Sequence, residues 1–297
     1  MKSVFVSAPA KVNLALRVGA RRPDGYHDLD TVFEAVDIFD DLQADLAPDL
    51  RLEISGLGEN LPVDESNLVI KAAHLLQKVT NTQQGAHIKV HKRIPVAGGM
   101  AGGSADAAAA LLALNTLWDL ELPDSHLAEL AGELGSDVPF ALLGGIARGT
   151  SRGEQLVSIK PGTLHGWVFL TSATGLSTPE VFHCFDEMFP TAGDPPVTTQ
   201  LCQALTGSDF SAIAQEMVND LAAPAAALRV DIADICAELA EFPGKTILSG
   251  SGPTIAIFCA AEAAESLAQE MQEKFPSRTA LAAIGPVTGA HIRRVEK

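Results

Sequence analysis

The residue pattern with the clearest chemical meaning is a glycine-rich loop that runs directly into a helix-forming segment. Four glycines within six residues, Gly98 to Gly103, allow the backbone to approach a ligand closely. The segment 104–117 is rich in Ala and Leu and predicts a helix. Free N–H groups and the dipole at a helix N-terminus favour a phosphate. The glycine-rich loop is taken as Pro95, Val96, Ala97, Gly98, Gly99, Met100, Ala101, Gly102, Gly103, Ser104 and Ala105.

This loop differs from the two commonest nucleotide-binding loops. It is not a Walker loop, because no Gly-Lys-Ser/Thr follows the glycines. The glycine spacing also differs from the Rossmann fingerprint. Composition alone leaves open a second interpretation, in which the loop is a tight turn that packs closely.

A second group of polar residues lies on an expected strand near the N-terminus. Over residues 11–18 the apolar positions alternate with others, which is typical of a strand with one buried face. Lys11 and Asn13 therefore share the face opposite Val12 and Leu14. Taken alone, a lysine in this position is usually solvated.

Two further segments could contribute to a site. Asp137 follows the helix end expected at Gly135 and precedes a proline-restricted turn, so by itself it is typical of a turn or cap residue. Ser249 to Thr254 is a second glycine-rich segment. It is either a plain hairpin turn or a loop that faces a nucleotide or an acceptor.

The elements that must position these residues mix strands and helices without regular βαβ alternation, which favours an α+β fold. A turn is expected at Ala8-Pro9, and two domains are expected, 1–157 and 158–297. Strands are predicted at 4–6, 11–18, 31–38, 50–55, 87–91 and 167–171, and helices at 66–79, 104–117, 124–135, 208–218, 228–241 and 261–274.

Composition narrows the class of protein. The net charge of −16 disfavours nucleic acid and anionic membranes as partners. The N-terminal residues lack the apolar core of a signal peptide, and no apolar stretch could span a bilayer, so a cytoplasmic protein is expected. The four cysteines match no metal-binding spacing and are expected to be reduced thiols. Monomer and homodimer both stay open.

The order of these segments is more specific than any one of them. A strand with Lys11, the glycine-rich loop and the 249–254 turn together resemble the three motifs of the GHMP kinases, which include galactokinase, homoserine kinase and mevalonate kinase. The resemblance runs from about residue 7 to residue 258. It implies a two-domain fold of mixed β-sheets with helices, in which nucleotide and acceptor bind in the cleft between domains.

Within that superfamily the details resemble the diphosphocytidyl-methylerythritol kinases. The matching segments are Ala8 to Leu14, Asp24 to His27 and Leu134 to Pro139. The resemblance implies transfer of the ATP γ-phosphoryl group to the 2-hydroxyl of a cytidine diphosphate methylerythritol, in the non-mevalonate synthesis of isoprenoid precursors.

The same resemblance implies a role for each site residue. Asp137 would be the general base on the acceptor hydroxyl, and Lys11 beside it would favour the ionised carboxylate and offset charge on the transferring group. The glycine-rich loop would hold ATP. The acceptor would be bound by Asn13 at its sugar alcohol, by Tyr26 and Phe182 stacked on the two faces of the cytosine, and by His27 at the base edge.

One departure concerns the metal. Many GHMP kinases have Ser-Ser where this loop has Gly102-Gly103, and the first of those serines ligates Mg²⁺. Here Ser104 lies two positions later. Mg²⁺ is expected with ATP, but the groups that hold it stay unknown, and phosphates and water could suffice.

Three alternatives stay open. A GHMP kinase for homoserine or mevalonate would not need the Asp24 to His27 segment, because those acceptors carry no base. A GHMP-fold binding or regulatory protein would not need both Lys11 and Asp137. A nucleotide-binding oxidoreductase lacks its glycine fingerprint here.

Overall fold

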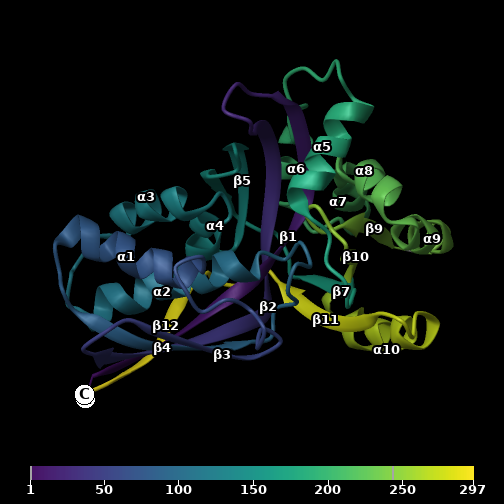
Figure 1. Ribbon diagram of the computed structural model, residues 1–297. Helices are drawn as coiled ribbons and strands as arrows, with labels where there is room; N and C mark the ends of the chain where they lie inside the picture. The colour runs from purple at the N-terminus through teal and green to yellow at the C-terminus, as the bar shows by residue number, and fades with distance from the viewer. Residues whose placement is uncertain (1, 243) are drawn as a thin grey trace.

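Two long antiparallel strands, β1 (Ser3–Arg21) and β2 (His27–Ala47), run between the two lobes of the molecule (Figure 1). The structure is a computed structural model that describes residues 2–242 and 244–297. Each lobe is built on a sheet with helices packed against it. This arrangement is the α+β, two-domain fold that the sequence predicts.

The first sheet has the order β12-β1-β2-β4-β3. Three further strands lie off this path: β5 pairs with β2 and with β6, and β8 pairs with β1. The long strands change partners along their length. β2 pairs with β4 over 41–47 and with β5 over 29–34. The bounds are β3 (Arg51–Gly56), β4 (Gly85–Lys92), β5 (Ile146–Ser151), β6 (Gln155–Ile159), β8 (Val218–Asn219) and β12 (His291–Glu296).

Breaks in the β1–β2 register explain how one hairpin serves two lobes. The register shifts between Pro9 and Ala10 and again between Asn13 and Ala15. The turn expected at Ala8-Pro9 is therefore wrong, because the chain continues as strand through an irregularity that accommodates the proline. Such irregularities bend a strand and re-aim its side chains, and here they bracket Lys11.

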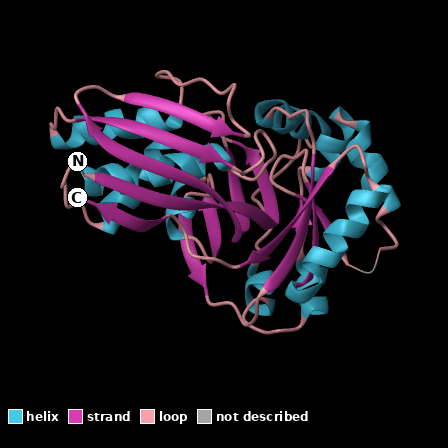
Figure 2. Cartoon of the chain, turned by 90° about the horizontal axis from the view of Figure 1, so that it is seen from below, coloured by secondary structure: helices cyan, strands magenta, loops and turns pink. Residues whose placement is uncertain are grey.

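Four helices cover one face of the first sheet: α1 (Leu68–Thr80), α2 (Gly102–Leu117), α3 (Asp124–Leu134) and α4 (Val138–Leu143). Figure 2, seen from below, shows the opposite face of this sheet without helices. α2 is buried along most of its length, and its alanines allow it to lie deep in the core. The predicted helices 66–79 and 104–117 are confirmed within about two residues.

The second lobe has the sheet order β11-β7-β10-β9. Four of its elements, β11, α5, α6 and α8, have no counterpart among the predicted elements. The bounds are β7 (His165–Thr171), β9 (Lys245–Leu248), β10 (Ile255–Ala260) and β11 (Thr279–Gly285), with α5 (Thr178–Met188), α6 (Thr199–Ala204), α7 (Phe210–Glu216), α8 (Ala222–Leu228), α9 (Val230–Glu238), the 3₁₀ turn η1 (Ala261–Ala263) and α10 (Ala264–Lys274).

The final strand, β12, returns to the first sheet and pairs with the start of β1, so the two chain ends lie side by side (Figure 2). The expected boundary after residue 157 falls within β6 and stays a prediction. Within the two described ranges, the helices are all too short or too polar to cross a bilayer.

A buried polar contact fixes the lobes to each other. Glu34 of β2 and His165 of β7 are both fully buried, and the Glu34 Oε2 atom lies 2.7 Å from His165 Nδ1. The second carboxylate oxygen accepts a hydrogen bond of 3.2 Å from Trp167 Nε1. Because buried charges and polar groups are costly unless paired, this contact favours one relative placement of the two sheets.

Candidate active site

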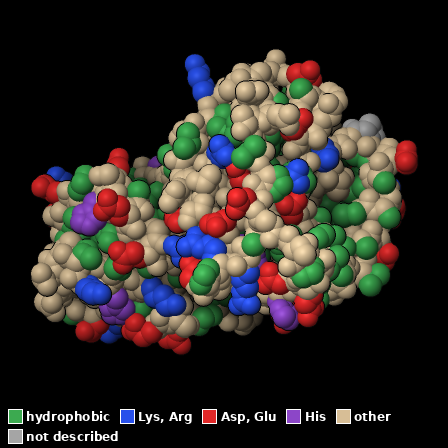
Figure 3. Space-filling model, turned by 90° about the horizontal axis from the view of Figure 1, so that it is seen from above, with side chains coloured by type: hydrophobic (Ala, Val, Ile, Leu, Met, Phe, Trp, Pro, Cys, Tyr) green, Lys and Arg blue, Asp and Glu red, His purple; other side chains and the backbone are tan. Residues whose placement is uncertain are grey.

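A cavity of about 780 Å³ lies between the lobes. Its walls come from β1 and β2, the glycine-rich loop, the start of α4, the start of α5 and the 249–254 turn. Viewed from above, basic and acidic side chains intermingle along the line where the lobes meet (Figure 3). The structure thus brings sequence-distant segments into one cleft.

The glycine-rich loop presents a helix N-terminus to this cavity. Ala97, Gly99 and Ala101 have φ values of 52°, 74° and 59°, in the left-handed region. These turns lead the chain into α2, whose first turn carries no acidic side chain. Gly102, Gly103 and Ser104 line the cavity, so the free N–H groups and positive dipole end of α2 can hold an anion there.

Close packing against the 249–254 turn holds the loop in place. Ser249 Oγ donates a hydrogen bond of 3.1 Å to the carbonyl of Gly99. A Cβ on Gly99 would lie 2.0 Å from the carbonyl oxygen of Ser249, so a side chain does not fit at this position. From the other side, the backbone N–H of Lys11 donates to the carbonyl of Met100 at 3.2 Å.

Lys11 is buried, with 6% of its surface exposed, and its ammonium group is held by neighbours. It donates a hydrogen bond of 2.6 Å to Asn13 Oδ1, which confirms that the two side chains share a face. Asn13 Nδ2 in turn donates to Thr31 Oγ1 at 2.9 Å. This chain of hydrogen bonds fixes the amide orientation, so that its oxygen faces Lys11.

Asp137 directly precedes α4, yet its side chain makes no capping hydrogen bond within the described residues. Its Oδ2 atom lies 3.7 Å from Lys11 Nζ, and a third of the side chain is exposed at the cavity. A carboxylate in this place can accept a proton from an alcohol while the ammonium group offsets negative charge nearby. The pairing expected for these two residues is therefore present.

The aromatic residues singled out in the sequence line another part of the same cavity. The rings of His27 and Phe182 are stacked, with centroids 4.9 Å apart. His27 Nε2 lies 2.8 Å from Asp186 Oδ1. Tyr26 is 52% exposed, and the Arg152 guanidinium lies over its ring at 5.0 Å. The stacking of a base between Tyr26 and Phe182 stays a prediction.

Several cavity residues were not predicted from the sequence. Arg152 and Arg21 bring positive charge to the cavity, and Asp186 orients His27. The hydroxyl oxygens of Thr178 and Ser251 lie 2.7 Å apart and connect the start of α5 to the 249–254 turn. Asp186 lies one helical turn after Phe182, which is the one local signal that could have revealed it.

A buried cluster supports the glycine-rich loop from behind. Lys92 Nζ lies 2.5 Å from one carboxylate oxygen of Asp40 and 2.5 Å from one of Asp106, and all three residues are buried. Burial raises the pKa of Asp106 to about 7, against the opposing pull of Lys92. The two carboxylates keep the pKa of Lys92 above its usual value although burial acts in the other direction.

Comparisons with known proteins show the family to which the chain belongs. Residues 67–145 match the GHMP kinase N-terminal domain and residues 201–277 the GHMP kinase C-terminal domain. The chain is 46% identical to the 4-diphosphocytidyl-2-C-methyl-D-erythritol kinase of Nocardioides sp. and 44% identical to that of Thermobifida fusca. The alignments cover 96% of this chain and 98% of the Nocardioides protein, and 98% of both chains for Thermobifida.

Solved structures give the same result for the fold. A crystal structure of 4-(cytidine 5'-diphospho)-2C-methyl-D-erythritol kinase is 29% identical, with a TM-score of 0.75, over 96% of this chain and 98% of that one. Homoserine kinase from Cytophaga hutchinsonii, at 20% identity, superposes with a TM-score of 0.76 over 98% of this chain and 97% of its own, and shows the fold alone. The chain belongs to the GHMP kinases, and within them to the family of 4-diphosphocytidyl-2-C-methyl-D-erythritol kinases.

The raised pKa of Asp106 predicts a pH-dependent stability. The folded-state pKa of about 7 lies above the ordinary value of 3.8, so between these two pH values the folded protein holds a proton that the unfolded chain has lost. The resulting stability is fully present below about pH 4, and it is lost progressively as the pH rises from about 4 to about 7. Asp106→Asn removes this titration, so wild type should lose about 1 kcal/mol relative to the variant between about pH 5 and 6, with little further change above about pH 7.

Urea unfolding of both proteins across this pH range measures the difference directly. A constant difference between wild type and Asp106→Asn would show that Asp106 does not titrate there.

Proposed function

We propose that this protein transfers the γ-phosphoryl group of ATP to the 2-hydroxyl of 4-diphosphocytidyl-2-C-methyl-D-erythritol, a step in the non-mevalonate synthesis of isoprenoid precursors. The observation that carries the chemistry is the Lys11–Asp137 pair, 3.7 Å apart on the cavity wall. The names of the full-length relatives supply the acceptor. The enzyme acts on small molecules, so no nucleic acid or membrane partner is required.

The donor is bound by the glycine-rich loop. Gly102 and Gly103 form the start of α2 and line the cavity, so the free N–H groups of this first turn can hold phosphate oxygens there. Magnesium enters as the Mg²⁺–ATP complex. Among residues 2–242 and 244–297, no cluster of three or more His, Cys, Asp or Glu side chains is placed to hold a metal. ATP phosphates and water would therefore supply most of its ligands, as is common for Mg²⁺.

Phosphoryl transfer needs in-line positioning and neutralised charge more than covalent help from the protein. The acceptor hydroxyl oxygen forms a bond to the γ-phosphorus while the bond from that phosphorus to the β–γ bridging oxygen breaks. The hydroxyl proton passes to the Asp137 carboxylate, and ADP leaves with the bridging oxygen. Lys11 offsets the charge on the transferring group, and Asn13 holds the acceptor alcohol near Lys11.

The acceptor base is recognised at the aromatic part of the cavity. In the structure the His27 ring covers one face of Phe182. A base between Tyr26 and Phe182 stacks either on the face of Phe182 that His27 does not cover or, once the His27 ring has moved, on the covered face. The backbone or ring of His27 then contacts the base edge. Arg152, already over the Tyr26 ring, is suited to the acceptor diphosphate.

Replacement of the proposed base tests the chemistry. Asp137→Asn should lower kcat by about 10²–10⁴-fold because the amide cannot accept the proton, while ATP affinity changes by less than about threefold. Glu133→Gln is the matched control, since Glu133 is exposed on α3 and does not line the cavity. Steady-state kinetics and ATP titration measure both effects. Near-normal turnover of Asp137→Asn would mean that Asp137 is not the base.

Replacement of the exposed aromatic tests the acceptor pocket. Tyr26→Ala should raise the acceptor KM about tenfold through the loss of ring stacking, with a smaller effect on the KM for ATP. Tyr26→Phe keeps the ring and should behave like wild type. An increase confined to the KM for ATP would place the base pocket elsewhere.

A further inference from the structure

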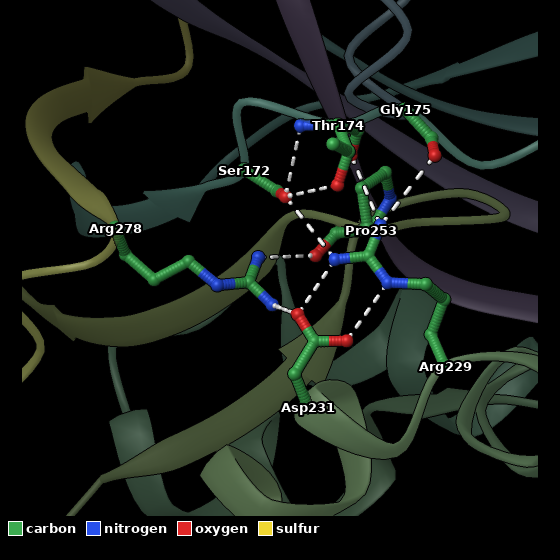
Figure 4. A network of polar contacts seen from close by, with 7 residues as sticks. All are labelled: Ser172, Thr174, Gly175, Arg229, Asp231, Pro253 and Arg278. Atoms are coloured by element: carbon green, nitrogen blue, oxygen red, sulfur yellow. Dashed lines mark hydrogen bonds and ion pairs between the residues drawn. The ribbon is translucent and has the colours of Figure 1, made fainter.

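A cluster of charged side chains contacts both the 249–254 turn and residues 172–177, the segment that leads into α5 (Figure 4). At its centre is Asp231 in α9, approached by Arg278 from one side and Arg229 from the other. None of these three residues lines the cavity. The cluster is therefore not part of the machinery assigned above.

Arg278 connects Asp231 to the 249–254 turn. Only 5% of its surface is exposed. Its Nη2 atom lies 2.5 Å from Asp231 Oδ2, and its Nη1 atom donates a hydrogen bond of 3.2 Å to the carbonyl of Pro253. One guanidinium group thus joins α9 to the turn whose Ser249 contacts the glycine-rich loop.

Arg229 connects the same carboxylate to a second segment, residues 172–177, which joins β7 to α5. It makes a two-pronged contact with Asp231, at 2.8 Å and 2.6 Å. Its other N–H groups donate to the carbonyl of Thr174 at 3.0 Å and to Ser172 Oγ at 3.2 Å. The short two-pronged geometry belongs to the strongest class of charge-assisted contacts.

Both of the connected segments reach the site. In the 172–177 segment, a Cβ on Gly175 would lie 2.6 Å from Ala97 Cβ, so this segment packs directly on the glycine-rich loop. It continues into Thr178 and Phe182 of α5, which line the cavity. In the 249–254 turn, Gly250 lies so close to Lys11 that a Cβ there would be 3.2 Å from the ammonium nitrogen.

We propose that Arg229, Asp231 and Arg278 are positioning residues that hold the 172–177 segment and the 249–254 turn in register against the glycine-rich loop. The inference rests on the proposed function, because it assigns each segment to one substrate. The turn positions Lys11 and the loop for phosphoryl transfer, whereas the 172–177 segment positions α5 for the acceptor.

The free-energy cost of burying charged groups supports a positioning role. A guanidinium as buried as that of Arg278 loses hydration, and buried ion pairs are often replaceable by apolar side chains without loss of stability. Directed contacts to three carbonyls and one hydroxyl, on segments far apart in the sequence, do what apolar packing cannot: they fix distances and orientations. Hydrogen bonding to Arg229 lowers the pKa of Asp231, so the central carboxylate is charged at neutral pH.

Three variants separate the contacts that Arg278 makes from those that Arg229 makes. Arg278→Met should lower kcat about tenfold with the acceptor KM within about twofold, because it loosens the turn beside Lys11. Arg229→Met should raise the acceptor KM about fivefold with kcat within about twofold, because it loosens the segment before α5. Asp231→Asn should show both effects.

Lys274→Met is the matched control. Lys274 is a cation of the same lobe that pairs with Glu238 at 3.4 Å and touches neither segment; its removal should leave both constants within about twofold of wild type. Arg278→Met leaves the Pro253 carbonyl without its donor and could fail to fold. Arg229 and Asp231 have side chains that are 21% and 45% exposed, so their variants still decide the question.

The proposal is overturned if Arg229→Met and Asp231→Asn lower only the melting temperature and leave kcat and both KM values within about twofold of wild type. Equal losses in Lys274→Met would also contradict it. A wild-type protein that does not turn over the diphosphocytidyl acceptor would instead contradict the proposed function. In that case, calorimetric titration with Mg²⁺–ATP tests the cluster alone: weaker binding by Asp231→Asn than by wild type supports it, and equal binding overturns it.

Discussion

The close approach of the glycine-rich loop to the 249–254 turn is the constraint on which the site depends. The two backbones meet where a Cβ on Gly99 would lie 2.0 Å from the Ser249 carbonyl oxygen. Because the loop belongs to the first lobe and the turn to the second, this contact fixes how close the two lobes lie at the cavity. It also places the N-terminus of α2 beside Lys11, so that the anion-binding end of the helix and the proposed catalytic lysine share one cavity.

The β1–β2 hairpin supplies the other half of the geometry. Its register breaks bend the strands toward both lobes and set Lys11 and Asn13 on the cavity wall rather than on a solvated face. In a chain with a net charge of −16, the cations Lys11, Arg21 and Arg152 nevertheless line one cavity. Local placement of charge, and not the overall balance, makes this acidic protein suited to phosphorylated ligands.

Local patterns predicted local structure well. The glycine-rich loop followed by α2 and the shared face of Lys11 and Asn13 were visible in the sequence, because each depends on neighbouring residues. The turn at Ala8-Pro9 was wrong, since a proline can also sit at a break in strand register. β11 and β12 were missed because pairing with strands far along the chain, rather than alternation, makes them strands.

The same limit applies to the site. The family resemblance led to Asp137, Tyr26 and Phe182, and the structure brings all three to the cavity. It could not reveal the His27–Asp186 contact, which joins positions 159 residues apart, or the cluster around Asp231.

The most direct test of the proposed function is ADP release from Mg²⁺–ATP with 4-diphosphocytidyl-2-C-methyl-D-erythritol, homoserine or mevalonate as acceptor. Turnover with the cytidine compound alone is the predicted result; turnover with another alcohol in its place would contradict the assignment of the aromatic pocket to a base.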